Sequence, residues 1–371
     1  LSEYLPSQGK QVDIFFQYFI WISIIWAVFN CLPIYPMDGG QMLSAVLGPR
    51  RAKALIILFS GILGLSVYGE EDRKNPRTAG QEFVAPLLRA RAASPMPEGE
   101  KEWEVLKDKW MGRIKDECFS GWPDHVSPDE PKEVFSVEKE GVTLQCVEYS
   151  SMGRRLPLYV AHRSGLEEPE LVVLNLLDVA AWEEFLATMR PGFEKQLSGQ
   201  GLPEGDPKSF KQHQGMFDSF KWVMAYAPPT GVGPTQLGPE KTGKRNLRLQ
   251  AAGQTIDSVR VWDARRAIQT LRSVGGMENV SLWLQGSGRM AGVLTYASLF
   301  EPEITRLDLH NPPLSHNDGP FFFNVLRIMD MPQAVAIALE RSKVVIYQKG
   351  KKGWEYPASV VQELGWETKL Q

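Results

Sequence analysis

Two short segments of this 371-residue chain place chemically useful residues in restrictive surroundings. In NCLPIYPMDGGQ, residues 30–41, Asp38 follows a run without charged residues from Ile14 to Met37. An aspartate at such a place is costly unless it faces a polar cavity or a metal ion. In LQGSGRMAG, residues 284–292, an expected strand breaks at glycines around Ser287 and continues into an expected helix. The first segment reads like part of a metal site, and the second raises the question of whether Ser287 is a nucleophile or an ordinary turn serine.

The first segment closely resembles the third core motif of the site-2 protease family, which are intramembrane zinc metalloproteases with an N-x-x-P…L-D-G-G signature. The resemblance covers residues 1–68 and rests on Asn30, Pro33, Pro36, Met37 in the usual leucine place, Asp38, Gly39 and Gly40. It implies that Asp38 is the third zinc ligand and that Asn30 helps to position the substrate backbone. The alternative is that Asp38 only caps a helix over residues 39–47.

The zinc site that this resemblance implies is incomplete in the chain. A catalytic zinc needs three protein ligands, and the family takes two of them from an H-E-x-x-H helix whose glutamate activates water. None of the five histidines forms that motif: His125, His162, His213, His310 and His316. We therefore expect zinc, and proteolysis, only if sequence upstream of Leu1 supplies the two histidines.

The second segment resembles the α/β-hydrolase fold, in particular acetyl-xylan-esterase-like proteins. The resemblance covers residues 134–371 and is carried by VWDARRAIQTLRSVGGMENVSLWLQGSGRMAGVLTYASLF, residues 261–300.

The family's nucleophile elbow, G-x-S-x-G, needs small residues two places before and after the nucleophile. If Gly286 leads the motif, Gly288 takes the nucleophile position and the hydroxyl is absent. If Ser287 is the nucleophile, its flanking residues Gln285 and Arg289 are too large, so we favour the first register.

The partners of a catalytic serine are also hard to find. The family's acid and histidine follow the later strands, yet no histidine follows SKVVIYQ, residues 342–348. The segment DLHNPPLSHND, residues 308–318, offers His316 or His310 as a base and Asp308 as an acid. The favoured hypothesis is a catalytically degenerate domain, a pseudoenzyme that binds an ester or a carbohydrate. The alternative is an active serine carboxylesterase that uses Ser287.

A third hypothesis for this segment is dinucleotide binding. GSGRMAG also fits G-x-G-x-x-A/G, and Asp308 follows Gly288 at the spacing of the acid that binds a ribose hydroxyl. That fingerprint usually opens its domain, whereas several expected strands and helices precede Gly286 here. We therefore rank nicotinamide or flavin binding below the hydrolase-like hypothesis.

Buried strands alternating with helices are expected to position these residues, which predicts an α/β fold with a mostly parallel sheet flanked by helices. A hairpin is expected from residues 142–150 and 156–162. Further strands are expected over residues 171–178, 221–228, 280–285, 304–310 and 342–348. Helices are expected over residues 100–118, 179–189, 255–274 and 357–365, and one directly after Gly288.

The rest of the chain sets its organisation. The uncharged run from Ile14 to Met37 is long enough to span a bilayer at roughly 20 residues, and a shorter run covers residues 54–68. We expect a transmembrane segment within residues 1–68, a linker over 69–100 and the hydrolase-like domain over 101–371. The protein is then membrane-attached, with a large soluble C-terminal domain on a side that the sequence does not fix. The abrupt change after Tyr68 fits a natural fusion, a truncated gene or a misjoined reading frame.

Composition excludes two further classes. The net charge of −3 and the lack of long basic runs give no reason to expect a nucleic-acid partner. The three cysteines, Cys31, Cys118 and Cys146, are too few and too scattered for a disulfide framework or a thiolate zinc site.

Overall fold

The computed structural model describes residues 95–123, 131–198, 201–350, 353–366 and 369–371, together with Ile20 and Ser23. From residue 95 onward these belong to one compact unit, Leu88–Gln371. Asn30, Asp38, nearly all of the expected transmembrane segment and most of the expected linker lie outside the described residues. Within the part of the chain that is described, no helix has the length and apolar character needed to cross a membrane.

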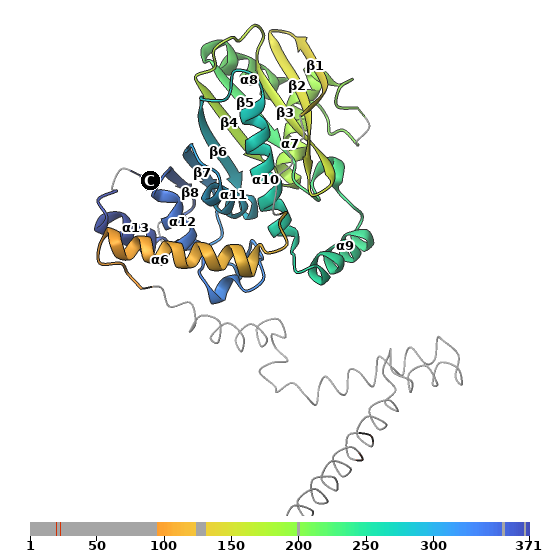
Figure 1. Cartoon of the computed structure of the whole chain (residues 1–371). Coiled ribbons are helices and arrows are strands. Elements are labelled where there is room, and N and C mark those ends of the chain that lie inside the picture. The colour runs from red at the N-terminus through yellow and green to blue at the C-terminus, as the bar shows by residue number, and fades with distance from the viewer. Residues whose placement is uncertain are drawn as a thin grey trace, which may run out of the picture. The chain divides into compact units, whose positions relative to one another are not determined.

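The described residues form an eight-stranded mixed sheet with the order β1-β2-β3-β5-β4-β6-β7-β8 (Figure 1). The pairs β1–β2, β2–β3 and β3–β5 are antiparallel. The pairs β5–β4, β4–β6, β6–β7 and β7–β8 are parallel. The strands are β1 (Lys132–Lys139), β2 (Val142–Ser151), β3 (Arg154–Arg163), β4 (Leu171–Leu176), β5 (Trp222–Ala227), β6 (Ser281–Ser287), β7 (Ile304–His310) and β8 (Lys343–Tyr347). The predicted α/β class and mostly parallel sheet are confirmed.

Helices lie on both faces of this sheet. They are α6 (Glu100–Arg113), continued by a π-helical turn (Ile114–Cys118), α7 (Val179–Phe193), α8 (Pro207–Ser219), α9 (Pro239–Ala251), α10 (Ile256–Ser273), α11 (Arg289–Phe300), α12 (Met331–Leu339) and α13 (Glu355–Glu363), with 3-10 turns at Gly233–Thr235 and Val325–Arg327. Gln285 borders a cavity beneath α7, whereas the next residue, Gly286, packs against α11. Because successive strand residues point to opposite faces, α7 and α11 cover opposite faces of the sheet.

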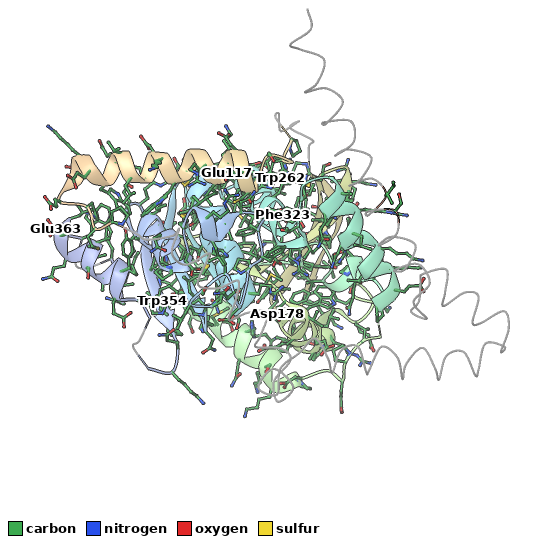
Figure 2. The ribbon with its side chains drawn as sticks, turned by 90° about the horizontal axis from the view of Figure 1, so that it is seen from below. Glu117, Asp178, Trp262, Phe323, Trp354 and Glu363 are labelled. Carbon is green, nitrogen blue, oxygen red and sulfur yellow. The ribbon has the colours of Figure 1, made fainter. Side chains whose placement is uncertain are left out.

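Helix α6 is fastened to the domain by tryptophans. Trp103 is 1% exposed, meets Trp110 and Trp366 edge to face, and donates from Nε1 to Glu340 at 3.1 Å. Figure 2 shows α6 lying along one side of the domain, from the helix that carries Glu363 toward Trp262. The helix predicted over residues 100–118 is confirmed.

Two fully buried carboxylates near the start of α10 hold the loops that border the parallel strands' carboxyl ends. Asp263 accepts hydrogen bonds from the Ser151 hydroxyl and, at 2.9 Å, from the Thr230 backbone N–H. Asp257 accepts one from the Phe321 backbone N–H at 2.8 Å. These hydrogen bonds tie each loop to the helix.

Replacing Trp103 by alanine should destabilise the domain by about 3–5 kcal/mol, because it removes a buried ring and leaves a cavity under α6. Chemical denaturation of the full chain measures this loss. Val105→Ala is the matched control, since Val105 lies on the same helix and is 71% exposed. Equal stability of the two variants would contradict the anchoring role of Trp103.

Candidate functional site

The turn between β6 and α11 is made by one residue, Gly288. Its backbone has φ 53° and ψ −123°, a conformation that glycine adopts far more easily than other residues. A Cβ on Gly288 would meet nothing within 4 Å, so the turn's apex is open to a ligand. The Gly288 N–H donates to the carbonyl of His310 at 2.8 Å, which joins the apex to the end of β7.

Gly286 makes this sharp turn possible. A Cβ there would lie 2.9 Å from a methyl group of Leu294 and 3.1 Å from the backbone carbon of Met290. Helix α11 therefore approaches β6 more closely than any side chain at position 286 would allow.

Ser287 is the last residue of β6 and is exposed. Its Cα pairs with that of His310 across β6 and β7. Its hydroxyl has no hydrogen-bond partner among the residues that the structure describes. The ring of His310 stacks on Tyr347, with ring centroids 4.5 Å apart. Ser287 and His310 thus share one edge of the sheet without a hydrogen bond between their side chains.

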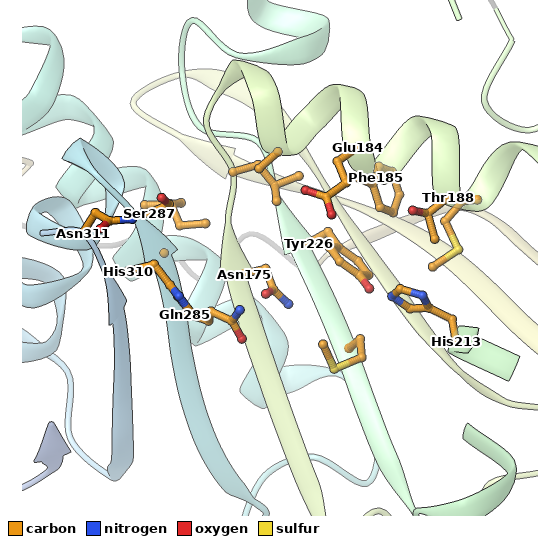
Figure 3. A pocket seen from close by; sticks show the side chains of 16 residues that line it. Asn175, Glu184, Phe185, Thr188, His213, Tyr226, Gln285, Ser287, His310 and Asn311 are labelled. Carbon is orange, nitrogen blue, oxygen red and sulfur yellow. The ribbon is translucent and has the colours of Figure 1, made fainter. Parts of the chain in front are cut away.

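A cavity of about 570 Å³ opens beside this turn, under α7. Figure 3 shows Glu184, Phe185 and Thr188 entering it from α7, with strand residues on the opposite wall. The polar or aromatic lining residues are Asn175, Glu184, Phe185, Thr188, His213, Tyr226, Gln285, Ser287, His310 and Asn311. The cavity therefore offers amide, hydroxyl, carboxylate and imidazole groups on an apolar floor, which suits a polar organic ligand.

The phenol of Tyr226 is unusual among these groups. Its oxygen is buried and has no hydrogen-bond partner in the described part of the chain. Burial raises its pKa, and the nearby Glu184 carboxylate raises it further. A buried phenol without a partner is costly, and a ligand oxygen in the cavity would relieve that cost.

His316 lies in a different environment. It is 5% exposed, with Nε2 2.8 Å from the Tyr296 hydroxyl and Nδ1 2.6 Å from the carbonyl of Pro320. Burial lowers its pKa, although the Pro320 carbonyl and the Asp330 and Asp257 carboxylates act in the opposite direction. Both ring nitrogens are engaged and His316 does not line the cavity, so the structure does not bring it to Ser287.

Asp308 is held by a neighbour on its own strand. Its Oδ1 lies 2.8 Å from both Nε and Nη2 of Arg306, whose guanidinium also sits 4.3 Å from the ring centroid of Trp283. The candidate acid Asp308 therefore forms an ion pair with Arg306, and it has no hydrogen bond to His310 or His316.

Dinucleotide binding would need the same carboxylate for a ribose hydroxyl, and Arg306 already occupies it.

Metal binding finds no support in the described residues. No group of three or more His, Cys, Asp or Glu side chains there could hold an ion. Asp38 lies outside them, so the zinc role that the resemblance implies for it stays a prediction.

Sequence reasoning missed most of the cavity. Asn175, Tyr226, His213 and Glu184 come from β4, β5, α8 and α7, and no spacing along the chain links them. One signal was present: Asn175 is a lone amide at the carboxyl end of the apolar strand LVVLNL. Such a residue at this edge of a parallel sheet marks a binding position.

Comparisons with known proteins confirm both resemblances. Residues 6–66 match the model of Peptidase family M50, the site-2 protease type. A search of curated proteins finds no match. The structure of a protein from Bacteroides fragilis NCTC 9343 described as an acetyl xylan esterase is similar, with a TM-score of 0.60 and 12% sequence identity. The match covers 78% of this chain and 80% of that chain. A glucuronoyl esterase from Solibacter usitatus has 14% identity, coverage of 72% and 81%, and a TM-score of 0.52. At these identities the likeness shows the fold alone, which is the α/β-hydrolase fold.

Gly286→Ala should destabilise the domain by about 1–3 kcal/mol, because the new methyl group overpacks the contact between β6 and α11. Urea denaturation of the full chain measures the change. Gly215→Ala is the control, because Gly215 lies in α8 with open space where a Cβ would be. That substitution should stabilise the domain by about 0.5–1 kcal/mol. A neutral Gly286→Ala variant would contradict the close approach of α11.

Proposed function

We propose that residues 101–371 form a degenerate α/β-hydrolase-type domain, which binds an ester or a carbohydrate in the cavity under α7 and does not cleave it through a serine nucleophile. The similarity to proteins named as acetyl xylan and glucuronoyl esterases supports this ligand class. The polar lining of the cavity, with Asn175, Thr188 and Gln285, supports binding of a hydroxyl-rich or carbonyl-containing ligand.

The observation that carries this proposal is the backbone of Gly288. In a nucleophile elbow the catalytic residue occupies the strained single-residue turn between strand and helix, which presents its side chain to the substrate. Gly288 has that strained backbone and no side chain. A domain with glycine at this place retains the elbow's shape without its hydroxyl.

A second candidate is a serine carboxylesterase with Ser287 as nucleophile and His310 as base. It is favoured by one observation: the two residues pair across β6 and β7, and both line the cavity. Against it stand the stacking of His310 on Tyr347 and the ion pair that Arg306 makes with Asp308. We therefore rank it second.

For residues 1–68 we propose membrane attachment by a site-2-protease-like segment. The support is the match of residues 6–66 to Peptidase family M50, together with the uncharged run from Ile14 to Met37. Asp38 as a zinc ligand and Asn30 as a substrate-positioning residue belong to this proposal, and both need an H-E-x-x-H helix from upstream sequence.

Acetylated xylo-oligosaccharides should bind the full chain, and Gln285→Leu should weaken that binding about fivefold to tenfold, because it removes one hydrogen-bonding amide from the cavity. Isothermal titration calorimetry measures the affinity. Gln212→Leu makes the same chemical change at an exposed site on α8 that does not line the cavity, and should leave the affinity unchanged. Equal affinities for both variants would place the ligand elsewhere.

Hydrolysis of p-nitrophenyl acetate by the full chain should equal the buffer background, because no positioned hydroxyl and base act together in the cavity. Ser287→Ala and His310→Ala should leave this rate unchanged. A rate above background that both substitutions abolish would establish the second candidate instead.

A further inference from the structure

Three guanidinium groups gather at the loop that follows β5. They come from three separate elements: Arg154 from the β2–β3 hairpin, Arg245 from α9 and Arg260 from α10. A Cβ placed on Gly231 would lie 3.0 Å from Nη2 of Arg245 and 3.3 Å from Nη2 of Arg260. The guanidinium groups of Arg245 and Arg260 therefore converge on the same point of the loop.

Two of the three cations have a carboxylate partner. Arg154 lies 3.9 Å from Oδ1 of the buried Asp263, and Arg260 lies 3.1 Å from Oδ1 of the buried Asp257. Arg245 has no ion pair or hydrogen bond with any residue in the described part of the chain, and its Nε is buried without a partner. One positive charge at this loop is thus left without compensation.

This arrangement is unfavourable in the free protein. Burial lowers the pKa of Arg245, and the positive charges of Arg260 and Arg154 lower it further. Next to Gly231, Thr230 is 1% exposed and buries a hydroxyl oxygen that also has no partner within the described residues. Like charges held together beside unsatisfied polar atoms indicate a place that an anion completes.

The convergence of two guanidinium groups favours a single anionic group as the ligand. Guanidinium groups bind carboxylate and phosphate oxygens in a bidentate way, and two that converge on one point can share a single anionic group. We propose that Arg245 and Arg260, with Arg154 adding positive charge, form a binding site for the carboxylate or phosphate group of a small molecule. This site does not depend on the function proposed for the cavity.

The proposed anion site lies at the same end of the domain as the cavity under α7. Within the loop, a Cβ on Gly233 would lie 2.8 Å from the ring of Trp182 on α7. Trp182 in turn stacks on Phe185, which lines the cavity. Occupation of the anion site therefore steadies a loop that packs against the cavity's own helix.

Titration calorimetry of the full chain, in neutral detergent at low ionic strength, tests the site with inorganic phosphate and with D-glucuronate as probes. We expect at least one probe to bind, and Arg245→Gln to weaken that binding about tenfold or more, since a charge-assisted bidentate contact is lost. Arg248→Gln is the matched control: it removes the same charge from an exposed position one turn further along α9 and should change the affinity less than twofold.

Binding of phosphate alone assigns the site to a phosphorylated ligand, binding of glucuronate alone assigns it to a carboxylate, and either result supports the proposal. Absence of binding by both probes would overturn the proposal. Equal weakening by the two substitutions would also overturn it, because that result indicates a diffuse positive field.

Thermal melting without a bound anion gives an independent readout. Arg245→Gln should raise Tm relative to wild type and to Arg248→Gln, whereas a lowered Tm would show that Arg245 is already satisfied and would also overturn the proposal.

Discussion

The close approach of α11 to β6 at Gly286 is the constraint on which the site depends. Because no side chain separates the helix from the strand, the chain must reverse direction within one residue, and Gly288 takes a backbone conformation that suits glycine. The hydrogen bond from the Gly288 N–H to the His310 carbonyl then fixes the end of β7 beside the turn. The positions of Ser287 and His310 at the cavity's rim follow from this one packing contact.

Buried charge at the start of α10 organises the surrounding loops. Asp257 and Asp263 each accept a backbone N–H from a loop and each face an arginine, so their negative charges are compensated inside the protein. Arg245 adds a cation that these two carboxylates do not balance. The same end of the domain therefore combines a strained glycine turn, a cavity lined with polar groups and an excess positive charge. This combination supports the proposed binding of a ligand there.

The sequence predicted those parts of the fold that continuous local patterns encode. The apolar run over residues 171–178 predicted β4, because strands buried on both faces need side chains of that kind. The segment over residues 304–310 was correctly predicted as the next strand, β7. Strand β1 was not predicted, since it lies at the sheet's edge and most of its residues are exposed. Helix α12 was missed as well, because its short apolar segment MPQAVAIAL has no clear helical period.

The site was less accessible to sequence reasoning. Residue size alone favoured Gly288 over Ser287 at the turn, and Gly288 has the strained backbone there. No pattern, however, distinguishes a loop histidine from a buried one: His316 bonds to Tyr296 and Pro320 only because folding brings these residues together. The convergence of Arg154, Arg245 and Arg260 also comes from three distant segments and had no local signal.

Covalent labelling distinguishes the proposed binding domain from one with an activated serine at its elbow. The full chain would be treated with a fluorophosphonate, which reacts with activated serines, and then measured by intact-protein mass spectrometry with peptide mapping. We expect no adduct, because the residue at the apex is Gly288 and the hydroxyl of Ser287 has no hydrogen-bonded base among the described residues. A stoichiometric adduct on Ser287 would contradict it.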